Sequence, residues 1–378
     1  MGFWQHIDYV LFLFYILSCK AREEGNVLMQ QNADIASENK LLTVVVPCYN
    51  SAAYMEEAVK SLLVGGREMD VLLVDDGSKD DTGSIADRLA QEHPDIVRVI
   101  HQPNGGHGSG LNRGIETAKG IYFKVVDSDD RLDADGLKAL LDLLRAYSAQ
   151  ENQADLVVHD YVYDHGEERQ VFSISYAGPF PQGKLFTWEE CRRFNLSNQF
   201  IIHCLVYRVG LLREHQYSLP EHTFYEDNLY VYQPLPWVKK LLYLHKNVYG
   251  YNVGREDQSV NEKNLIKRLD QLTNMITAMA TSWHMASLNQ LPKRLRQYMV
   301  NNVSGQIWSL CALHHIANTE ESKMLNENLW RSIQTWDGEF YKAILRHPVG
   351  HMAHWRTGLG KRLLVSAYRL GHRLMKFG

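Results

Sequence analysis

The motif DSDD at residues 127–130 closes the predicted strand 121–127 and offers several carboxylates within a few residues. Side chains two apart on an extended chain point the same way, so Asp127 and Asp129 are expected to converge. Two carboxylates beside a diphosphate suit Mg²⁺ or Mn²⁺, because these ions take few protein oxygens and complete their coordination with phosphate and water. An acidic turn that caps the next helix is the structural alternative.

Two further segments add polar groups to the same region. The turn DDGS at residues 75–78 follows another apolar run, and helix capping alone would explain it. The segment NGGHGSG at residues 104–110 includes Gly105 and Gly106, and such glycines let backbone N–H groups approach a phosphate or ribose at a helix start. Its spacing matches neither a Walker loop nor a Rossmann fingerprint, which argues against a dehydrogenase.

These segments lie where predicted strands and helices alternate. The strands are predicted at 43–47, 71–75, 97–101 and 121–127, and the helices at 52–63, 81–91, 111–119 and 133–147. Such alternation predicts an α/β fold with a mainly parallel sheet, in which ligands bind at the carboxyl ends of the strands. The two acidic turns then share one sheet edge, which is the predicted nucleotide and metal site.

The rest of the chain changes character twice. Residues 156–253 are irregular and rich in aromatic residues, with short predicted strands, and form the predicted acceptor-facing half. Beyond Asn261, apolar residues recur every three or four positions, which predicts helices packed on one side. We expect an N-terminal extension (1–40), a catalytic domain (41–260) with a nucleotide-binding half (41–150) and an acceptor half (151–260), and a helical C-terminal region (261–378).

Composition and targeting signals narrow the class of protein. The 378 residues carry a formal net charge of −4, which argues against a nucleic-acid partner. The five cysteines lack the spacing of a zinc site and the density of a disulfide scaffold, so a reducing, cytoplasmic setting fits best. The apolar run 9–19 is too short for the roughly 20 residues that span a bilayer, and residues 1–8 lack the Lys or Arg of a signal peptide.

Five motifs occur in order, at fitting distances, within residues 41–261. They are VVVPCYN (44–50), VDDGS (74–78), NGG (104–106), NRG (112–114) and VDSDD (126–130). This series resembles glycosyltransferase family 2, whose members have the GT-A fold. The resemblance implies a GT-A α/β domain, while the first 40 residues and the helical C-terminal region lie outside it.

The resemblance also implies roles for single residues. Pro47, Tyr49 and Asp76 would surround the nucleotide base, with Tyr49 offering a ring face and Asp76 accepting a hydrogen bond from a base N–H, which favours uracil. Asp127 and Asp129 would be the family's DxD pair. One of the two would reach the ribose or a bridging water, and Asp129 is the residue expected to contact the metal directly.

Farther along, FYEDNL at residues 224–229 is similar to the family's Glu-Asp motif, which supplies the general base in inverting members. An acceptor hydroxyl becomes far more nucleophilic as its proton leaves, while a metal and nearby cations stabilise the departing diphosphate. Adjacent residues on a helix point about 100° apart, so the base is assigned to Asp227 and a supporting role to Glu226. An exposed acidic helix start is the alternative.

Residues 251–259 resemble the family's closing segment, in which Arg255 would neutralise leaving-group charge. A surface arginine is the equal alternative. The sequence departs from the family at Leu111, where many members carry an arginine beside the base or phosphate, and this departure bears on the choice of a uridine donor. No role is assigned to three aromatic residues of the acceptor half, Trp188, His203 and Trp237.

We therefore expect an inverting transfer of a sugar from a UDP-sugar to a glycan or lipid-linked glycan, with Mg²⁺ or Mn²⁺, in cell-surface polysaccharide assembly. Two alternatives stay open. A sugar-nucleotide nucleotidyltransferase normally carries a Gly-rich loop with arginine and lysine after its first strand, where this chain has PCYN (47–50). A non-catalytic GT-A scaffold would not need the intact Asp127, Asp129 and Asp227.

The C-terminal tail is basic, with no acidic residue after Glu339. Its predicted helix places apolar and basic side chains on adjacent faces. The apolar face comprises Leu363, Ala367, Leu370, Leu374 and Phe377, and the basic face comprises Arg362, Arg369, Arg373 and Lys376. This pattern predicts a helix that lies in an anionic membrane surface, placing the protein at the inner face of the membrane. Packing on the catalytic domain with a solvated basic face is the alternative.

Overall fold

The computed structural model describes residues 40–149, 151, 153–164, 172–195, 198–252 and 261–375. The apolar run 9–19, like the rest of the predicted extension up to residue 39, lies outside this part of the chain, and so does the predicted boundary at residue 260. No helix in the described ranges has both the length and the apolar character needed to cross a membrane.

The first part of the sheet follows the predicted alternation of strands and helices. Four parallel strands take the order β3-β2-β1-β4. The strands are β1 (Leu42–Cys48), β2 (Met69–Asp75), β3 (Val97–His101) and β4 (Tyr122–Val125), and the helices are α2 (Met55–Leu63), α3 (Thr82–Glu92), α4 (His107–Thr117) and α5 (Ala134–Ala146). Every residue of β1 and β2 is buried, as expected for parallel strands covered on both faces.

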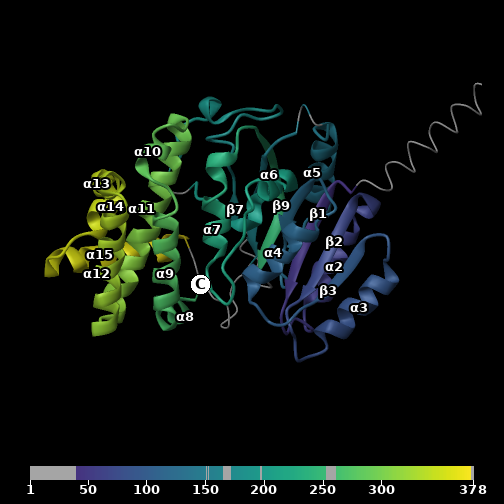
Figure 1. Cartoon of the computed structure of the whole chain (residues 1–378), viewed down its shortest axis with the longest axis horizontal. Coiled ribbons are helices and arrows are strands. Elements are labelled where there is room, and N and C mark those ends of the chain that lie inside the picture. The colour runs from purple at the N-terminus through teal and green to yellow at the C-terminus, as the bar shows by residue number, and fades with distance from the viewer. Residues whose placement is uncertain are drawn as a thin grey trace, which may run out of the picture. The chain divides into compact units, whose positions relative to one another are not determined.

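The register of these strands decides where the site lies. Cys48, the last residue of β1, pairs with Asp75, the last residue of β2, and Val125 at the end of β4 pairs with Val45 of β1. Because the strands are parallel, the loops that follow them leave the sheet at one edge. In Figure 1, β1 to β3 lie together on the side of the molecule away from the C-terminal helices.

The acceptor half extends the sheet with both strand directions. Antiparallel β8 (Leu205–Arg208) joins β4 to β6 (Leu156–Asp164), and β9 (Leu241–Asn252) runs parallel to β6. The short strands β5 (Arg131–Leu132) and β7 (Phe172–Ile174) pair antiparallel with β9 and β6. The prediction of only short strands here is wrong for β6 and β9, because register shifts between β6 and β9 break the alternation by which a long strand is recognised.

Short helices connect these strands and carry part of the site. They are η4 (Trp188–Glu190), η5 (Ile202–Cys204), α6 (Val209–Glu214), α7 (Asp227–Tyr232) and η6 (Leu235–Trp237). The turn η5 precedes β8 directly, and α7 packs against a helix of the C-terminal region. The acceptor half therefore presents side chains from short, separate elements rather than from one long helix.

The chain beyond Asn261 is helical, as predicted. It forms α8 (Glu262–Lys267), α9 (Leu269–Ala280), α10 (Met285–Leu288), α11 (Lys293–Ala317), α12 (Glu320–Trp336), α13 (Gly338–Arg346), α14 (Pro348–Ala353) and α15 (Gly358–Met375). In α9 the predicted stripe of Leu269, Leu272, Ile276 and Met279 is buried. Figure 1 shows these helices gathered on one side of the molecule, beside α7.

Helix α15 packs by a face other than the predicted apolar one. Leu364 and Tyr368 are buried, whereas Leu363 and Leu370 of the predicted face are 50% and 58% exposed. Leu359, one turn earlier, is 70% exposed and extends that outward face. Side chains beyond residue 371, which include the rest of the predicted faces, lie outside the described residues.

Helix α4 begins at His107, four residues before the predicted start, and contains glycines that let it approach β1. A Cβ atom at Gly114 would lie 2.8 Å from Val45 Cγ2 and 3.0 Å from Phe123 Cε2. Glycine therefore brings the helix directly onto the strand, although it lowers intrinsic helix stability. The first turn of α4 is placed at the sheet edge by this close packing.

Replacement of Gly114 by alanine is expected to destabilise the fold by about 1–3 kcal/mol, the usual cost of overpacking a core. The matched control is Gly305→Ala in α11, where a Cβ atom would meet nothing within 4 Å. That change should stabilise the protein by roughly 0.5–1 kcal/mol. Urea unfolding followed by circular dichroism measures both, and equal stability of Gly114→Ala and the parent would contradict the tight packing.

Candidate active site

A cavity of about 470 Å³ lies at the carboxyl edge of the parallel strands, and we call it the strand-edge cavity. Its lining includes the predicted site residues Pro47, Tyr49, Asp76, Gly106, Asp127, Asp129 and Glu226. Tyr49 is 48% exposed, so its ring face is accessible. None of the described residues that line the cavity is a lysine or an arginine. Among the described lining residues, positive charge can therefore come only from a histidine.

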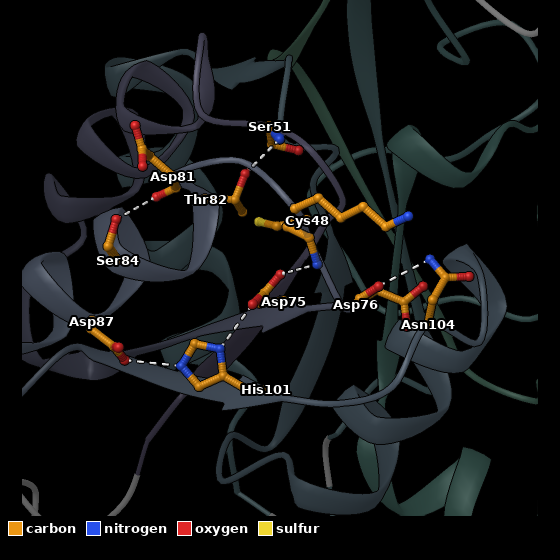
Figure 2. A network of polar contacts seen from close by, with 12 residues as sticks. Cys48, Ser51, Asp75, Asp76, Asp81, Thr82, Ser84, Asp87, His101 and Asn104 are labelled. Atoms are coloured by element: carbon orange, nitrogen blue, oxygen red, sulfur yellow. Dashed lines mark hydrogen bonds and ion pairs between the residues drawn. The ribbon is translucent and has the colours of Figure 1, made fainter.

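Asp76 holds the glycine-rich loop in place. Its carboxylate accepts hydrogen bonds from the backbone N–H groups of Gly105 (2.9 Å) and Gly106 (2.7 Å) and from Gln102 Nε2 (2.8 Å). Asn104 Nδ2 donates to the Asp76 carbonyl oxygen at 3.0 Å (Figure 2). A carboxylate has about four acceptor positions, so most of the capacity of Asp76 is used inside the protein. The contact with a nucleotide base stays a prediction.

A second network, drawn in Figure 2, connects β2, α3 and β3 through His101 and two carboxylates. His101 Nδ1 lies 2.9 Å from Asp75 Oδ2, and His101 Nε2 lies 3.0 Å from Asp87 Oδ1. Burial acts to raise the pKa of Asp75, but hydrogen bonds with Ser78 and His101 lower it. The carboxylates of Asp75 and Asp87 raise the pKa of His101. This network supports the turn after β2 and lies outside the cavity lining.

The DSDD motif forms a turn rather than the end of a strand. Strand β4 stops at Val125, and the backbone N–H of Asp130 donates to the Asp127 carbonyl oxygen at 3.0 Å. Alternation along an extended chain therefore does not apply to Asp127 and Asp129. Instead, Asp127, Asp130 and His203 bring potential ligand atoms within 4.8 Å of one another. Asp129 lines the strand-edge cavity and stays a predicted metal ligand.

The residues of this group fit a divalent cation. Asp127 Oδ1 and His203 Nδ1 are buried and have no hydrogen-bond partner within the described ranges, although buried polar atoms normally have one. The Asp130 carboxylate is held by the Tyr249 hydroxyl (2.5 Å) and by a backbone N–H (2.7 Å). Burial and the charge of Asp127 raise the pKa of Asp130 well above its ordinary value, and a bound cation would oppose that shift.

His107 connects the two acidic motifs, a role that the sequence analysis does not assign to it. Its Nδ1 atom lies 2.6 Å from Glu226 Oε1, and its Nε2 atom lies 3.4 Å from Asp127 Oδ1. Burial opposes a positive charge on His107, but the two carboxylates outweigh it and raise the pKa well above its ordinary value. The imidazole is therefore a cation in the strand-edge cavity. Its only sequence signal is its place in a glycine-rich motif at a helix start.

Asp227 faces an adjoining cavity of about 460 Å³, the helix-side cavity, which shares His107, Asp127 and Glu226 with the first. Glu226 is 3% exposed and bound by His107, whereas Asp227 is half-buried at the start of α7. Burial and the charge of Glu226 raise the pKa of Asp227 to about 7. A carboxylate with that pKa is suited to accept a proton near neutral pH.

A buried lysine lies behind the acidic group. Lys124 in β4 is fully buried, with Nζ 2.8 Å from His159 Nε2 and 2.6 Å from the carbonyl oxygen of His203, to which it donates. Burial lowers the pKa of Lys124 to about 7. The His203 ring lies 4.5 Å from the Tyr249 ring and 4.4 Å from the Tyr251 ring, measured between centroids. His203 is thus fixed beside Asp127, and no spacing in the sequence indicates this position.

The structure describes the remaining residues singled out in the sequence, except Arg255. Arg255 lies outside the described residues. Gly105 sits behind the cavity, where its carbonyl oxygen accepts a backbone hydrogen bond at 2.6 Å. Leu111 is fully buried in α4, so the side chain at this position serves the core. Trp188 is buried, and the Trp237 ring stacks on the His215 ring.

Residues 43–214 match the family described as "Glycosyl transferase family 2". The glycosyltransferase GlyG of Streptococcus pneumoniae serotype 4 is 36% identical over 140 residues, which cover 36% of this chain and 44% of that protein. The uncharacterised glycosyltransferase EpsJ of Bacillus subtilis is 35% identical over 133 residues, which cover 35% of this chain and 37% of that protein. The match spans less than half of the length of either relative.

Solved structures of S. aureus TarS share the fold. TarS 1–349 superposes with a TM-score of 0.63 at 20% identity, covering 88% of this chain and 92% of that chain. Its complex with UDP-GlcNAc gives a TM-score of 0.61 at 18% identity, with the same coverage. This likeness confirms the predicted GT-A fold and extends into the C-terminal helices. Residues 43–214 of the chain are thus similar to glycosyltransferase family 2, and the resemblance inferred from the sequence motifs is confirmed over that segment.

Proposed function

We propose that the protein is an inverting, metal-dependent glycosyltransferase that moves a hexose or N-acetylhexosamine from a UDP-sugar to a glycan hydroxyl. The observation that carries this proposal is the meeting of Asp127, His107, Glu226 and Asp227 where two cavities adjoin. The strand-edge cavity has the groups needed to hold a nucleotide diphosphate. The helix-side cavity leaves space for an acceptor beside a half-buried carboxylate.

Three features support a uridine diphosphate donor in the strand-edge cavity. The exposed ring of Tyr49, next to Pro47, offers a stacking surface for the base. The cationic His107 supplies positive charge where the described lining lacks lysine and arginine, and Arg255 is proposed to add to it. S. aureus TarS, which shares the fold, was crystallised with UDP and with UDP-GlcNAc.

Asp127 and Asp129 are the proposed metal-binding carboxylates. Asp130 and His203 lie close enough to Asp127 to hold the same ion, and Asp127 Oδ1, 3.4 Å from His107 Nε2, forms no hydrogen bond within the described ranges. Bound Mg²⁺ or Mn²⁺ supplies Lewis-acid stabilisation of the charge that develops on the leaving diphosphate. Hydrogen bonds from Tyr249 and a backbone N–H orient the Asp130 carboxylate, and stacking on Tyr249 orients the His203 ring.

Asp227 is the proposed general base. It accepts the proton of the acceptor hydroxyl as the oxygen attacks the anomeric carbon from the side opposite the diphosphate, and this geometry inverts the configuration. Asn228 Nδ2 donates to Asp227 Oδ1 at 3.2 Å and helps to orient it. Glu226 is occupied by His107, so we propose for it a supporting role.

Binding of UDP is expected to be tighter with Mg²⁺ or Mn²⁺ than with EDTA, and tighter than binding of GDP or dTDP. Asp129→Ala should abolish the metal-dependent gain, because one remaining carboxylate of the DxD pair holds a metal–diphosphate pair poorly. Titration calorimetry measures both effects. The control is Asp135→Ala, which removes an exposed carboxylate in the first turn of α5. Unchanged metal-stimulated UDP binding in Asp129→Ala would refute the assignment.

Asp227→Asn should keep the affinity for UDP and lower sugar transfer by about a hundredfold or more, the usual scale for losing a general base. In the parent, transfer should fall as pH drops below about 7, because Asp227 becomes protonated there and accepts no further proton. The variant should lack this pH limb. Rates of product formation across neutral pH check both expectations.

Asp270→Asn, which changes an exposed carboxylate of α9, is the control for this experiment. It should leave both the rate and the pH profile unchanged. Near-parent transfer by Asp227→Asn would place the base elsewhere. The anomeric configuration of the product, read by NMR, tests inversion independently of either variant.

We further propose that the protein is cytoplasmic and binds reversibly, through α15, to an anionic membrane surface that carries lipid-linked acceptors for surface polysaccharide. Leu359, Leu363 and Leu370 point outward, and Arg362 and Arg369 are exposed on the same helix. Each basic group near an anionic leaflet contributes about 1 kcal/mol, and the exposed leucines add apolar burial. Attachment would hold the active site near an acceptor that cannot leave the bilayer.

Serine at positions 359, 363 and 370 together should weaken sedimentation with anionic vesicles by more than about tenfold, because burial of even one leucine is worth about 1.5–3 kcal/mol. Met324→Ser, which removes a 60% exposed side chain from α12, should have no effect. Binding of the parent should also weaken at high salt. Equal sedimentation of the triple variant and the parent would sink this proposal.

A further inference from the structure

A third cavity, of about 500 Å³, lies among the C-terminal helices and shares no described lining residue with the two active-site cavities. Its walls come from α11, α12 and α13 and from the segment between Ala353 and Lys361. We call it the bundle cavity. The cavity opens to solvent, because Lys323, Glu327, Arg331 and Arg356 of its lining are exposed.

The bundle cavity is strongly positive. Lys323, Arg331, Arg356 and Lys361 line it, against a single carboxylate, Glu327. Lys323 is paired with a glutamate, whereas Arg331, Arg356 and Lys361 form no ion pair with any described residue. The chain as a whole carries a formal charge of −4, so this concentration of cations is local. Such a cavity favours an anionic ligand.

The cations of the bundle cavity lower the pKa values of two neighbouring histidines, which carry no negative charge to neutralise them. Burial and the charge of Lys361 lower the pKa of His315, and burial and the charge of Arg356 lower the pKa of His354. Both imidazoles line the cavity and are neutral near pH 7. They therefore add hydrogen-bonding groups without adding charge.

His314, at the wall of the cavity, has one buried ring nitrogen without a hydrogen-bond partner among the described residues. The Thr273 hydroxyl donates to the Leu269 carbonyl oxygen at 2.5 Å, so the 3.0 Å contact between Thr273 Oγ1 and His314 Nε2 requires the imidazole to donate. Burial lowers the pKa of His314 to about 4, which keeps the ring neutral. Its Nδ1 atom is then a lone-pair acceptor. The side chain is 2% exposed, and Nδ1 has no partner within the described ranges.

Aromatic rings complete the lining. Trp355 is partly exposed in the cavity, and Trp330 is 8% exposed, with its ring edge-to-face with His354 at 4.8 Å. An indole combines a large apolar face with one N–H donor, which suits the apolar face and the hydroxyls of a sugar ring. Cations and indole rings together match a ligand that has negative charge, hydroxyl groups and an apolar face.

We propose that the bundle cavity is a second binding site, for a saccharide that carries phosphate or carboxylate groups. Arg331, Arg356 and Lys361 bind the anionic groups, and Trp355 packs on the sugar ring. The same helix α11 lines the helix-side cavity through Leu310 and Leu313. The site goes beyond the proposed transfer reaction, and its test does not depend on that reaction.

Titration calorimetry of the full chain with tetragalacturonate and with glucose 1-phosphate tests the proposal. Both should bind, and neutral maltotetraose and inorganic tripolyphosphate should each bind at least about tenfold more weakly than tetragalacturonate, because each lacks one class of contact. The double variant R331Q/R356Q should lose about tenfold or more in affinity for tetragalacturonate, since a hydrogen bond to a charged group is worth about a factor of ten.

Two controls locate the site. R362Q/R369Q removes the same charge from exposed positions of α15 outside the cavity lining, and it should bind tetragalacturonate as the parent does. Asp129→Ala in the strand-edge cavity should also leave this binding unchanged. Absence of binding by both anionic saccharides overturns the proposal, and so does equal affinity of R331Q/R356Q and the parent. Tripolyphosphate that binds as tightly as tetragalacturonate would reduce the site to a simple anion site and likewise overturn it.

Discussion

The contact between His107 Nδ1 and Glu226 Oε1, 2.6 Å long, joins residues that are 119 positions apart. This contact depends on Asp76 and on Gly108, which belongs to the glycine-rich segment 104–110. Asp76 accepts the loop's backbone N–H groups, so α4 begins at the right place, and Gly108 lacks the Cβ atom that would lie 2.6 Å from a carbonyl oxygen of the acceptor half. Glu226 and Asp227 both line the helix-side cavity, and because His107 binds Glu226, Asp227 is the one proposed to accept a proton there. The two halves of the domain are therefore joined through the groups proposed to do the chemistry.

Buried ionisable groups lie around the contact between His107 and Glu226, and their charges are compensated to different degrees. Lys124 is fully buried and has no carboxylate partner among the described residues, and burial lowers its pKa to about 7. Its hydrogen bonds to His159 and to the His203 carbonyl oxygen offset part of the cost of burial. Asp130 is held by Tyr249, whose ring also stacks on His203. An enzyme that binds a cation here would recover stability lost in arranging these groups, since ligands stabilise the state that binds them.

Helix α11 of the C-terminal region contacts the proposed active site directly. Gln306 of α11 donates to Asn228 at 3.1 Å, and Asn228 in turn donates to Asp227. Farther along α11, Leu313 lines the helix-side cavity and the adjacent His314 lines the bundle cavity. One helix thus orients the proposed base and forms a wall of two cavities. A long helix suits this purpose because its packing on several neighbours keeps successive turns in fixed positions.

The sequence by itself determined the alternation of β1 to β4 with α2 to α5 and the edge at which the acidic turns lie. Those features follow from local periodicity and from the geometry common to parallel sheets, so no contact between distant residues is needed to infer them. The tertiary structure alone decided that β4 stops at Val125, that Asp130 and His203 stand beside Asp127, and that His107 links the acidic motifs. A single histidine or aspartate has no period and no characteristic spacing. Its partners are chosen only when strands and helices far apart in the chain pack against each other.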